Sequence, residues 1–151
     1  MSRLASIAVR VESLPDPKPV AVPGSRGLGT LGVDALLAEL AGLLERLATD
    51  QLAATIDLSS LPMGPQDRIE LQAALGPGEV QVTLSAGGIS TLHDTSVPGI
   101  WWTEHRDAGG NLTAELIDVT CIPSILVNDP AELPAAAAAL RALVAARQAG
   151  A

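Results

Sequence analysis

The spacing of hydrophobic residues divides the chain into stretches with different expected structures. Residues 4–13 alternate between apolar and polar side chains, which is the period of a half-buried strand. Prolines and glycines interrupt any regular pattern across residues 15–32, which favours an extended connector. From residue 33 to about residue 49, leucines recur at helical spacing and predict an amphipathic helix. We therefore expect an N-terminal strand and connector over residues 1–32 and a single domain over residues 33–151.

The rest of the chain carries signals for a second helix, a sheet and a closing helix. Pro65 suits the first turn of a helix, and Gly76 followed by Pro77 suits its end. Asp129 opens a capping arrangement before an alanine-rich helix. Alternating stretches separated by glycine or proline turns predict an antiparallel meander. The fold class is therefore α+β, an antiparallel β-meander sheet of about four strands flanked by two or three α-helices. A short extended piece at residues 55–58 precedes the expected strands, which are residues 80–85, 89–95, 99–106 and 112–122.

Charge and composition exclude several classes of function. The chain has 151 residues, with 17 acidic against 9 basic side chains and a net charge of −8. Binding to a phosphate backbone needs clustered lysine and arginine, so a nucleic-acid partner is not expected. Cys121 is the single cysteine, which excludes an internal disulfide. No apolar run reaches the roughly 18 residues of a membrane span, and we expect a cytoplasmic protein.

Two motifs suggest chemistry that their surroundings do not support. Residues 27–32 match the GxGxxG spacing, but dinucleotide binding requires a strand running directly into the first glycine and a parallel βαβ unit. Cys121 could act as a nucleophile with His93 or His105 as its base. In a strand, however, Cys121 shares a face with Val119, which predicts an inert buried thiol. We therefore expect that the protein has no catalytic residues, binds no cofactor and is not an enzyme.

A metal site is the alternative chemistry. Its candidate ligands are His93, Asp94, His105 and Cys121. No two of them have a local ligand spacing such as HxxxH or CxxC, so we assign no metal ligands. A carrier of nickel or iron nevertheless stays open as a second hypothesis.

Two adjacent tryptophans, Trp101 and Trp102, are the only aromatic residues besides histidine. Successive residues of a strand point to opposite faces of the sheet. If helices cover one face, one tryptophan enters the core and the other lies on the open or edge surface. An exposed tryptophan suggests a contact anchor, because tryptophan is enriched at binding hot spots. The alternative is that helices cover both faces and both side chains.

Several short stretches, in a fixed order, carry a further signal. They are IDLSSLP at residues 56–62, Asp67-Arg68, LGPGEV at residues 75–80, Asp94-Thr95, Gly99-Ile100-Trp101, and Ile117-Asp118-Val119 followed by Ile122-Pro123. In this order and spacing they resemble the HupH/HyaF family of hydrogenase expression/formation proteins, over residues 36–133. That family usually has glutamate where Asp94 and Asp118 stand, and a basic or otherwise polar residue after the tryptophan that matches Trp101.

The resemblance implies an accessory, chaperone-like role in the maturation of a [NiFe] uptake hydrogenase. The implied partners are an immature hydrogenase subunit or other maturation proteins, and the alternative is a metal carrier for cofactor assembly. Longer members of the family carry two divergent copies of this unit and this chain holds one, so a homodimer is one expected assembly. The residues expected to bind a partner are Asp94, Thr95, Gly99, Trp101, Trp102 and Asp118.

Overall fold

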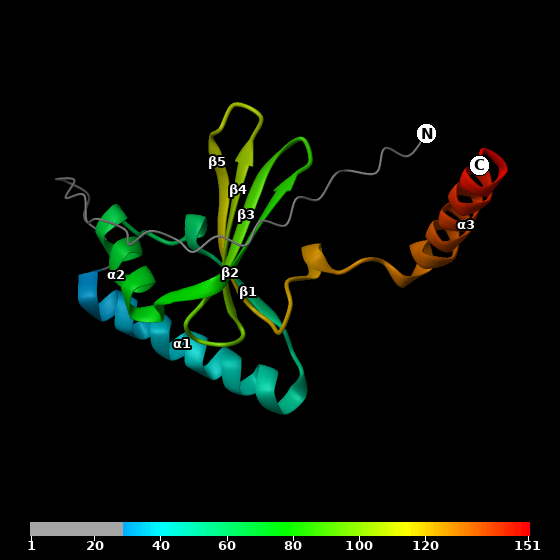
Figure 1. Ribbon diagram of the computed structural model, residues 1–151. Coiled ribbons are helices and arrows are strands. Elements are labelled where there is room, and N and C mark those ends of the chain that lie inside the picture. Colours follow the sequence, from blue (N-terminus) through cyan, green and yellow to red (C-terminus); the bar gives the residue numbers. More distant parts are fainter. Residues whose placement is uncertain (1–28) are drawn as a thin grey trace. The chain divides into compact units, whose positions relative to one another are not determined.

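The structure is a computed structural model that describes residues 29–151 (Figure 1). These residues form two compact units, which are residues 29–121 and Ile122–Ala151. The single domain expected over residues 33–151 stays a prediction. The strand expected at residues 4–13 and the connector that precedes residue 29 lie outside the described residues.

The first two helices are defined by their end residues. Helix α1 spans Gly29–Asp50 and so begins earlier than the expected residue 33. Helix α2 spans Pro65–Leu75, and the side chain of Asp67 accepts a hydrogen bond of 2.8 Å from the Gly64 N–H at its start. Gly76 ends α2 with φ +69°, a conformation that glycine adopts without a Cβ penalty. The expected proline start and glycine end of α2 are confirmed.

An antiparallel sheet of five strands forms the centre of the first unit. Its spatial order is β1-β5-β4-β3-β2, so four strands make the expected meander. The α+β fold with an antiparallel meander is confirmed. The sheet has five strands where about four were expected, because the short β1 joins it by pairing with β5. Local alternation cannot reveal such a long-range pairing. The strands are β1 Ala54–Asp57, β2 Pro77–Ser85, β3 Gly88–Thr95, β4 Ile100–Asp107 and β5 Leu112–Val119.

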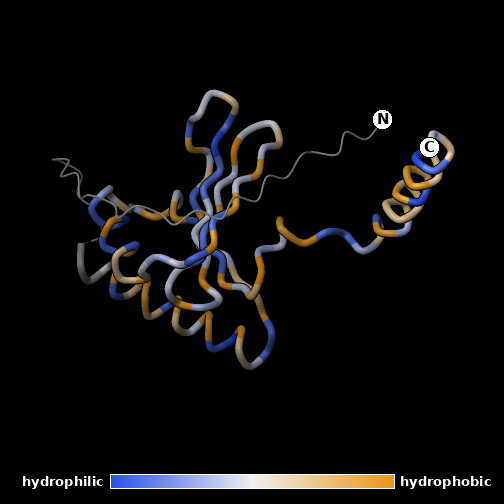
Figure 2. Tube along the Cα trace, viewed as in Figure 1, coloured by the Kyte–Doolittle hydropathy of each residue, from blue (hydrophilic) through white to orange (hydrophobic). Residues whose placement is uncertain are grey.

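Helices α1 and α2 pack against the same face of the sheet, which we call the helix-covered face. Leu40 of α1 and Leu71 of α2 join Trp102 and Ile117 in the main hydrophobic core. A short 3-10 helix after β1, Leu58–Ser60, adds Leu58 to the same core. Figure 2 shows apolar residues spaced along α1. Burial of these aliphatic and indole side chains supplies the main stabilisation of this unit.

The second unit contains two 3-10 helices, Ser124–Leu126 and Pro130–Glu132, followed by helix α3, Leu133–Ala149. The side chain of Asp129 accepts a hydrogen bond of 2.9 Å from the Ala131 N–H, as the capping pattern predicts. No residue of α3 is buried. None of the helices in the part of the chain that the structure describes is long and apolar enough to cross a membrane.

Candidate partner-binding surface

The opposite face of the sheet, which α1 and α2 do not cover, carries Trp101 between two carboxylates. The β3–β4 pairing sets Asp94 opposite Trp101, and the β4–β5 pairing sets Asp118 opposite Trp101. The β1–β5 pairing then sets Thr55 beside Asp118. Directly opposed residues on antiparallel strands point to the same face. Asp94, Trp101, Asp118 and Thr55 therefore form one row across four strands, which we call the Trp101 row.

The two tryptophans have different environments. Trp102 is 1% exposed and lies in the main core, where its ring stacks on His93 with centroids 6.4 Å apart. Trp101 is half-buried on the other face. The expectation that one tryptophan enters the core and the other lies on the surface is confirmed. The sheet register, which the sequence does not show, decides that Trp101 is the accessible one.

Hydrogen bonds fix both carboxylates of the Trp101 row. Asp118 accepts from the Thr55 hydroxyl at 2.7 Å through Oδ1 and from the Thr103 hydroxyl at 2.9 Å through Oδ2. Asp94 accepts from the Val80 backbone N–H at 2.8 Å. Sequence reasoning missed Thr55 and Thr103, because threonine in a strand gives no local sign of the side chain that it will support. Both aspartates are thus oriented by the fold itself.

No cation from the described part of the chain forms an ion pair with either aspartate. The ion pairs there join Arg68 to Glu115 at 2.5 Å and Arg106 to Glu104 at 3.0 Å. The two aspartates of the Trp101 row belong to neither pair. Trp101 therefore lies between carboxylates whose charge the surrounding sheet does not compensate.

The remaining residues of the expected set do not offer side chains at the surface. Thr95 is 6% exposed, and its hydroxyl lies 3.1 Å from the carbonyl oxygens of Val97 and Ile100 in the β3–β4 turn. Gly99 has φ +89°, which an L side chain rarely adopts, and a Cβ there would press on Leu44 of α1. Trp102 is in the core, as described above. The structure thus brings Asp94, Trp101 and Asp118 together, whereas Thr95, Gly99 and Trp102 shape the turn and core beneath them.

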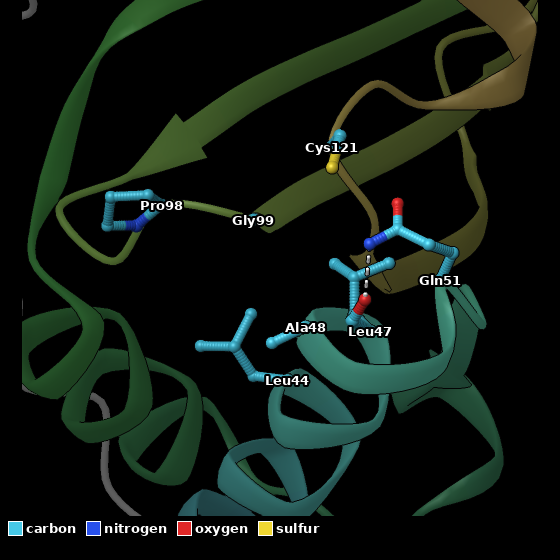
Figure 3. A pocket seen from close by; sticks show the side chains of 7 residues that line it. All are labelled: Leu44, Leu47, Ala48, Gln51, Pro98, Gly99 and Cys121. Carbon is cyan, nitrogen blue, oxygen red and sulfur yellow. Dashed lines mark hydrogen bonds between the residues drawn. The ribbon is translucent and has the colours of Figure 1, made fainter.

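Cys121 lies in an apolar groove, and its expected burial is wrong. Strand β5 ends at Val119, so the alternation that would have buried the thiol does not reach Cys121, which is exposed. Figure 3 shows the side chains that line this groove, which has a volume of about 530 Å³. Its lining contains no histidine or carboxylate to act as a base for the thiol. The lining residues are Leu44, Leu47, Ala48, Gln51, Pro98, Gly99 and Cys121.

The metal-carrier hypothesis gains no geometric support from the two histidines. His93 pairs with Trp102 on the helix-covered face, whereas His105 pairs with Ala114 on the opposite face. Their rings therefore point to opposite sides of the sheet and cannot ligate one ion. Across residues 29–151, no group of three or more histidine, cysteine, aspartate or glutamate side chains is placed to hold a metal ion.

The dinucleotide-binding motif is also out of place. Helix α1 already begins at Gly29, inside the GxGxxG match. Every strand pair of the described sheet is antiparallel. The parallel βαβ unit that would present the glycines to a pyrophosphate is therefore absent from the described residues.

These features define a class: a small α+β domain with an antiparallel sheet, helices on one face, and an aromatic and acidic row on the other. The conserved family described as "HupH hydrogenase expression protein, C-terminal conserved region" matches residues 30–147. The chain belongs to this HupH family of hydrogenase expression proteins. The resemblance seen in the ordered short motifs is confirmed.

Named relatives agree with the family match. The chain is 32% identical over 99 residues to the hydrogenase expression/formation protein HoxQ of Azotobacter vinelandii, covering 64% of this chain and 35% of HoxQ. It is 28% identical over 125 residues to HupH of Rhizobium leguminosarum bv. viciae, covering 82% of this chain and 44% of HupH. The chain thus spans less than half the length of these relatives.

A solved structure shares the fold. It is the hydrogenase expression protein HupH from Thiobacillus denitrificans, 43% identical, with a TM-score of 0.72. The match covers 77% of this chain and 97% of that chain. The shared fold therefore takes in nearly all of that solved chain.

Proposed function

We propose that this protein is a non-enzymatic accessory factor, acting as a chaperone in the maturation of a [NiFe] uptake hydrogenase in the cytoplasm. It binds an immature hydrogenase subunit or another maturation protein through the Trp101 row. Family membership supports the link to hydrogenase maturation, because the relatives are named hydrogenase expression/formation proteins. The observation that carries the binding surface is Trp101 itself, half-buried between two oriented carboxylates on the face away from α1 and α2.

The Trp101 row has the physical properties of a binding anchor. An indole ring supplies a large contact area, and buried aromatic residues dominate the energetics of many interfaces. Asp94 and Asp118 are already held by hydrogen bonds, so binding costs little side-chain entropy at these positions. Neither aspartate forms an ion pair with a cation of residues 29–151, and such a carboxylate favours an arginine or lysine from the partner. Arginine also stacks on tryptophan.

The exposed thiol of Cys121 fits a cytoplasmic location. An unpaired surface cysteine persists best where the cell keeps thiols reduced. The same thiol lies in the groove beside α1 and not in the Trp101 row, so the proposed binding step does not use it.

The test is a comparison of partner capture by three tagged full-length chains from hydrogenase-producing cells of the native host. Wild type, Trp101→Ala and the control Ile69→Ala are purified, and bound proteins are identified by mass spectrometry. Ile69 is a surface residue of α2, 36% exposed, and tests loss of apolar area away from the Trp101 row.

We expect wild type and Ile69→Ala to retain an immature hydrogenase subunit or a maturation protein. Trp101→Ala should weaken that binding by about 2 kcal/mol, roughly thirtyfold, if Trp101 is a hot spot. Equal capture by Trp101→Ala would remove the Trp101 row from the proposal. Capture of no hydrogenase-related protein by wild type, from cells verified to make hydrogenase, would overturn the proposed function.

A further inference from the structure

Strand β2 is one edge of the sheet, and its outer side has no strand beside it among the described residues. Edge strands present unpaired N–H and C=O groups, and natural proteins usually protect them with lysine, proline or bulges. In β2 such protection is confined to the first part, where Pro77 and an irregular register precede Gln81. Residues 81–85 pair regularly with β3 and carry no charge or proline. Within residues 29–151, this stretch is therefore an edge without such protection.

The backbone phase of β2 identifies which residues face outward. In an antiparallel pair, successive residues direct their backbone groups alternately toward the partner strand and away from it. The Ala86 N–H donates to the Gly88 carbonyl at 3.2 Å, and the Val80 N–H donates to the side chain of Asp94 at 2.8 Å. The backbone N–H and C=O groups of the even-numbered residues of β2 therefore point toward β3. The outward backbone groups belong to Gln81, Thr83 and Ser85.

The other edge of the sheet is a poorer template. Strand β1 has only four residues and continues directly into the 3-10 helix at Leu58–Ser60. The Asp57 carbonyl accepts a hydrogen bond of 2.7 Å from the Ser60 hydroxyl, so part of its polar backbone is already used. An added strand would find a longer regular edge at β2 than at β1.

Charge selects the kind of segment that fits the β2 edge. Strands β2 and β3 contain Glu79 and Asp94 but no lysine or arginine. Asp94 is bonded to the Val80 N–H, so it lies at the same end of β2 as Glu79. A second copy of this acidic chain, with net charge −8, would bring like charges together at that edge. A segment with basic residues would instead be attracted to it.

From these observations we infer that the outer edge of β2 binds an extended, basic segment of the client by strand addition. The inference rests on the proposed function, because an immature client is the source of such a segment. The client strand exchanges backbone hydrogen bonds with Gln81, Thr83 and Ser85. Its apolar side chains lie beside Val80 and Leu84, and its basic residue lies near Glu79 and Asp94.

The probe is a nine-residue peptide in which valine and threonine alternate with lysine, acetylated and amidated at its ends. The matched peptide has glutamate in place of lysine. Nuclear magnetic resonance of the full chain follows amide shifts and hydrogen exchange during titration. We expect slower exchange at Gln81, Thr83 and Ser85 with the lysine peptide. The glutamate peptide should bind about tenfold more weakly because of charge repulsion.

Three variants test the contacts separately. Thr83→Pro removes one outward N–H and keeps the inner β2–β3 bonds, a position at which edge strands accept proline. It should weaken binding of the lysine peptide about tenfold. Thr83→Val keeps the backbone N–H and should bind as wild type does. Glu79→Lys leaves the backbone intact and should weaken binding about threefold to tenfold, which keeps the test valid if Thr83→Pro unfolds.

Three outcomes would overturn the inference. They are equal binding of the two peptides, protection at the Trp101 row or β1 instead of β2, and a free chain that is already a dimer through β2 by light scattering and exchange. Failure of the proposed function is seen separately, in the partner capture with Trp101→Ala. If the lysine peptide binds at β2 but no hydrogenase-related partner is captured, strand addition at β2 would be supported and the proposed client would be wrong.

Discussion

The two faces of the sheet each carry one of the adjacent tryptophans, and the two side chains have different surroundings. On the helix-covered face, Trp102 is 1% exposed and packs with leucines of α1 and α2. On the opposite face, Trp101 is half-buried and has a carboxylate on either side. The comparison shows that the face to which a side chain points, and not its residue type, decides whether the residue joins the core or stays partly exposed. Substitutions at the two positions should therefore separate folding from binding.

Charges on the two faces also differ. On the helix-covered face, Glu115 is 3% exposed and is paired with Arg68, which also donates to the Met63 carbonyl at 2.7 Å. On the opposite face, Asp118 is held by neutral threonine hydroxyls. The Glu115 charge is buried and paired, whereas Asp118 forms no ion pair with a cation of residues 29–151. Losing a partner should consequently cost more on the helix-covered face.

The largest expected effect is at Trp102. Trp102→Ala should lower the free energy of unfolding by about 3–5 kcal/mol, because it opens a cavity in the main core. Trp101→Ala should lower it by less than about 1 kcal/mol, as expected for a half-exposed position. Urea unfolding followed by circular dichroism measures both. Equal losses would show that both tryptophans serve the core and would remove the distinction between the faces.

A smaller loss is expected at the buried ion pair. Arg68→Leu should cost about 2–3 kcal/mol, because it leaves the Glu115 carboxylate buried without a cation. The double variant Arg68→Leu/Glu115→Leu should cost less than the sum of the two single variants. Additive losses in the same urea experiment would contradict a coupled pair.

Next in size is the hydrogen-bonded carboxylate of the Trp101 row. Asp118→Ala removes the acceptor of the Thr55 and Thr103 hydroxyls and should cost about 1–2 kcal/mol of stability. Asp118→Asn keeps an acceptor oxygen and should cost less, while it removes the negative charge. If the proposed surface is right, both variants lose affinity for a basic client. A client that binds Asp118→Asn as well as wild type would show that this charge is not used.

The smallest expected effect lies in the β4–β5 turn, away from the centre of both faces. Hydrogen bonds from the Asn111 side chain and backbone, then from the Gly109 and Gly110 backbone, hold the pKa of Asp107 below its ordinary value of 3.8. A lowered folded-state pKa gives a stabilising contribution that is present above pH 3.8 and is lost as pH falls through the folded-state value. Asp107→Asn should flatten the acid limb of the melting temperature plotted against pH. Parallel acid limbs for wild type and variant would contradict this assignment.

Local chemistry made much of the fold predictable. Pro65 and Gly76 mark the ends of α2 because proline and glycine have strong conformational preferences of their own. The alternating strands and glycine turns of the meander are likewise short-range signals. The adjacent tryptophans were predicted to separate, since strand geometry requires it. Each of these features depends on residues within about one turn or one hairpin of each other.

Features that depend on distant pairing were not predictable from the sequence alone. Strand β1 joins the sheet only through β5, so the short extended piece expected at residues 55–58 gave no sign that it would pair into the sheet. The Trp101 row depends on three strand registers at once, and a shift of one residue would exchange its members. Cys121 was expected to be buried because the alternation was extended past Val119, where β5 ends. The assembly of a homodimer stays a prediction.

The β3–β4 turn ties three parts of the first unit together. The backbone N–H of Ser96 lies 3.2 Å from the Leu75 and Gly76 carbonyls at the end of α2, and the Thr120 N–H donates to the Gly99 carbonyl at 2.9 Å. This turn leads directly into β4 and so sets which tryptophan points to which face. An insertion or deletion of one residue there would point Trp101 toward the helix-covered face and Trp102 toward the opposite face. We therefore expect members of the family to differ in length more at the turns of residues 86–87 and 108–111 than at residues 96–99.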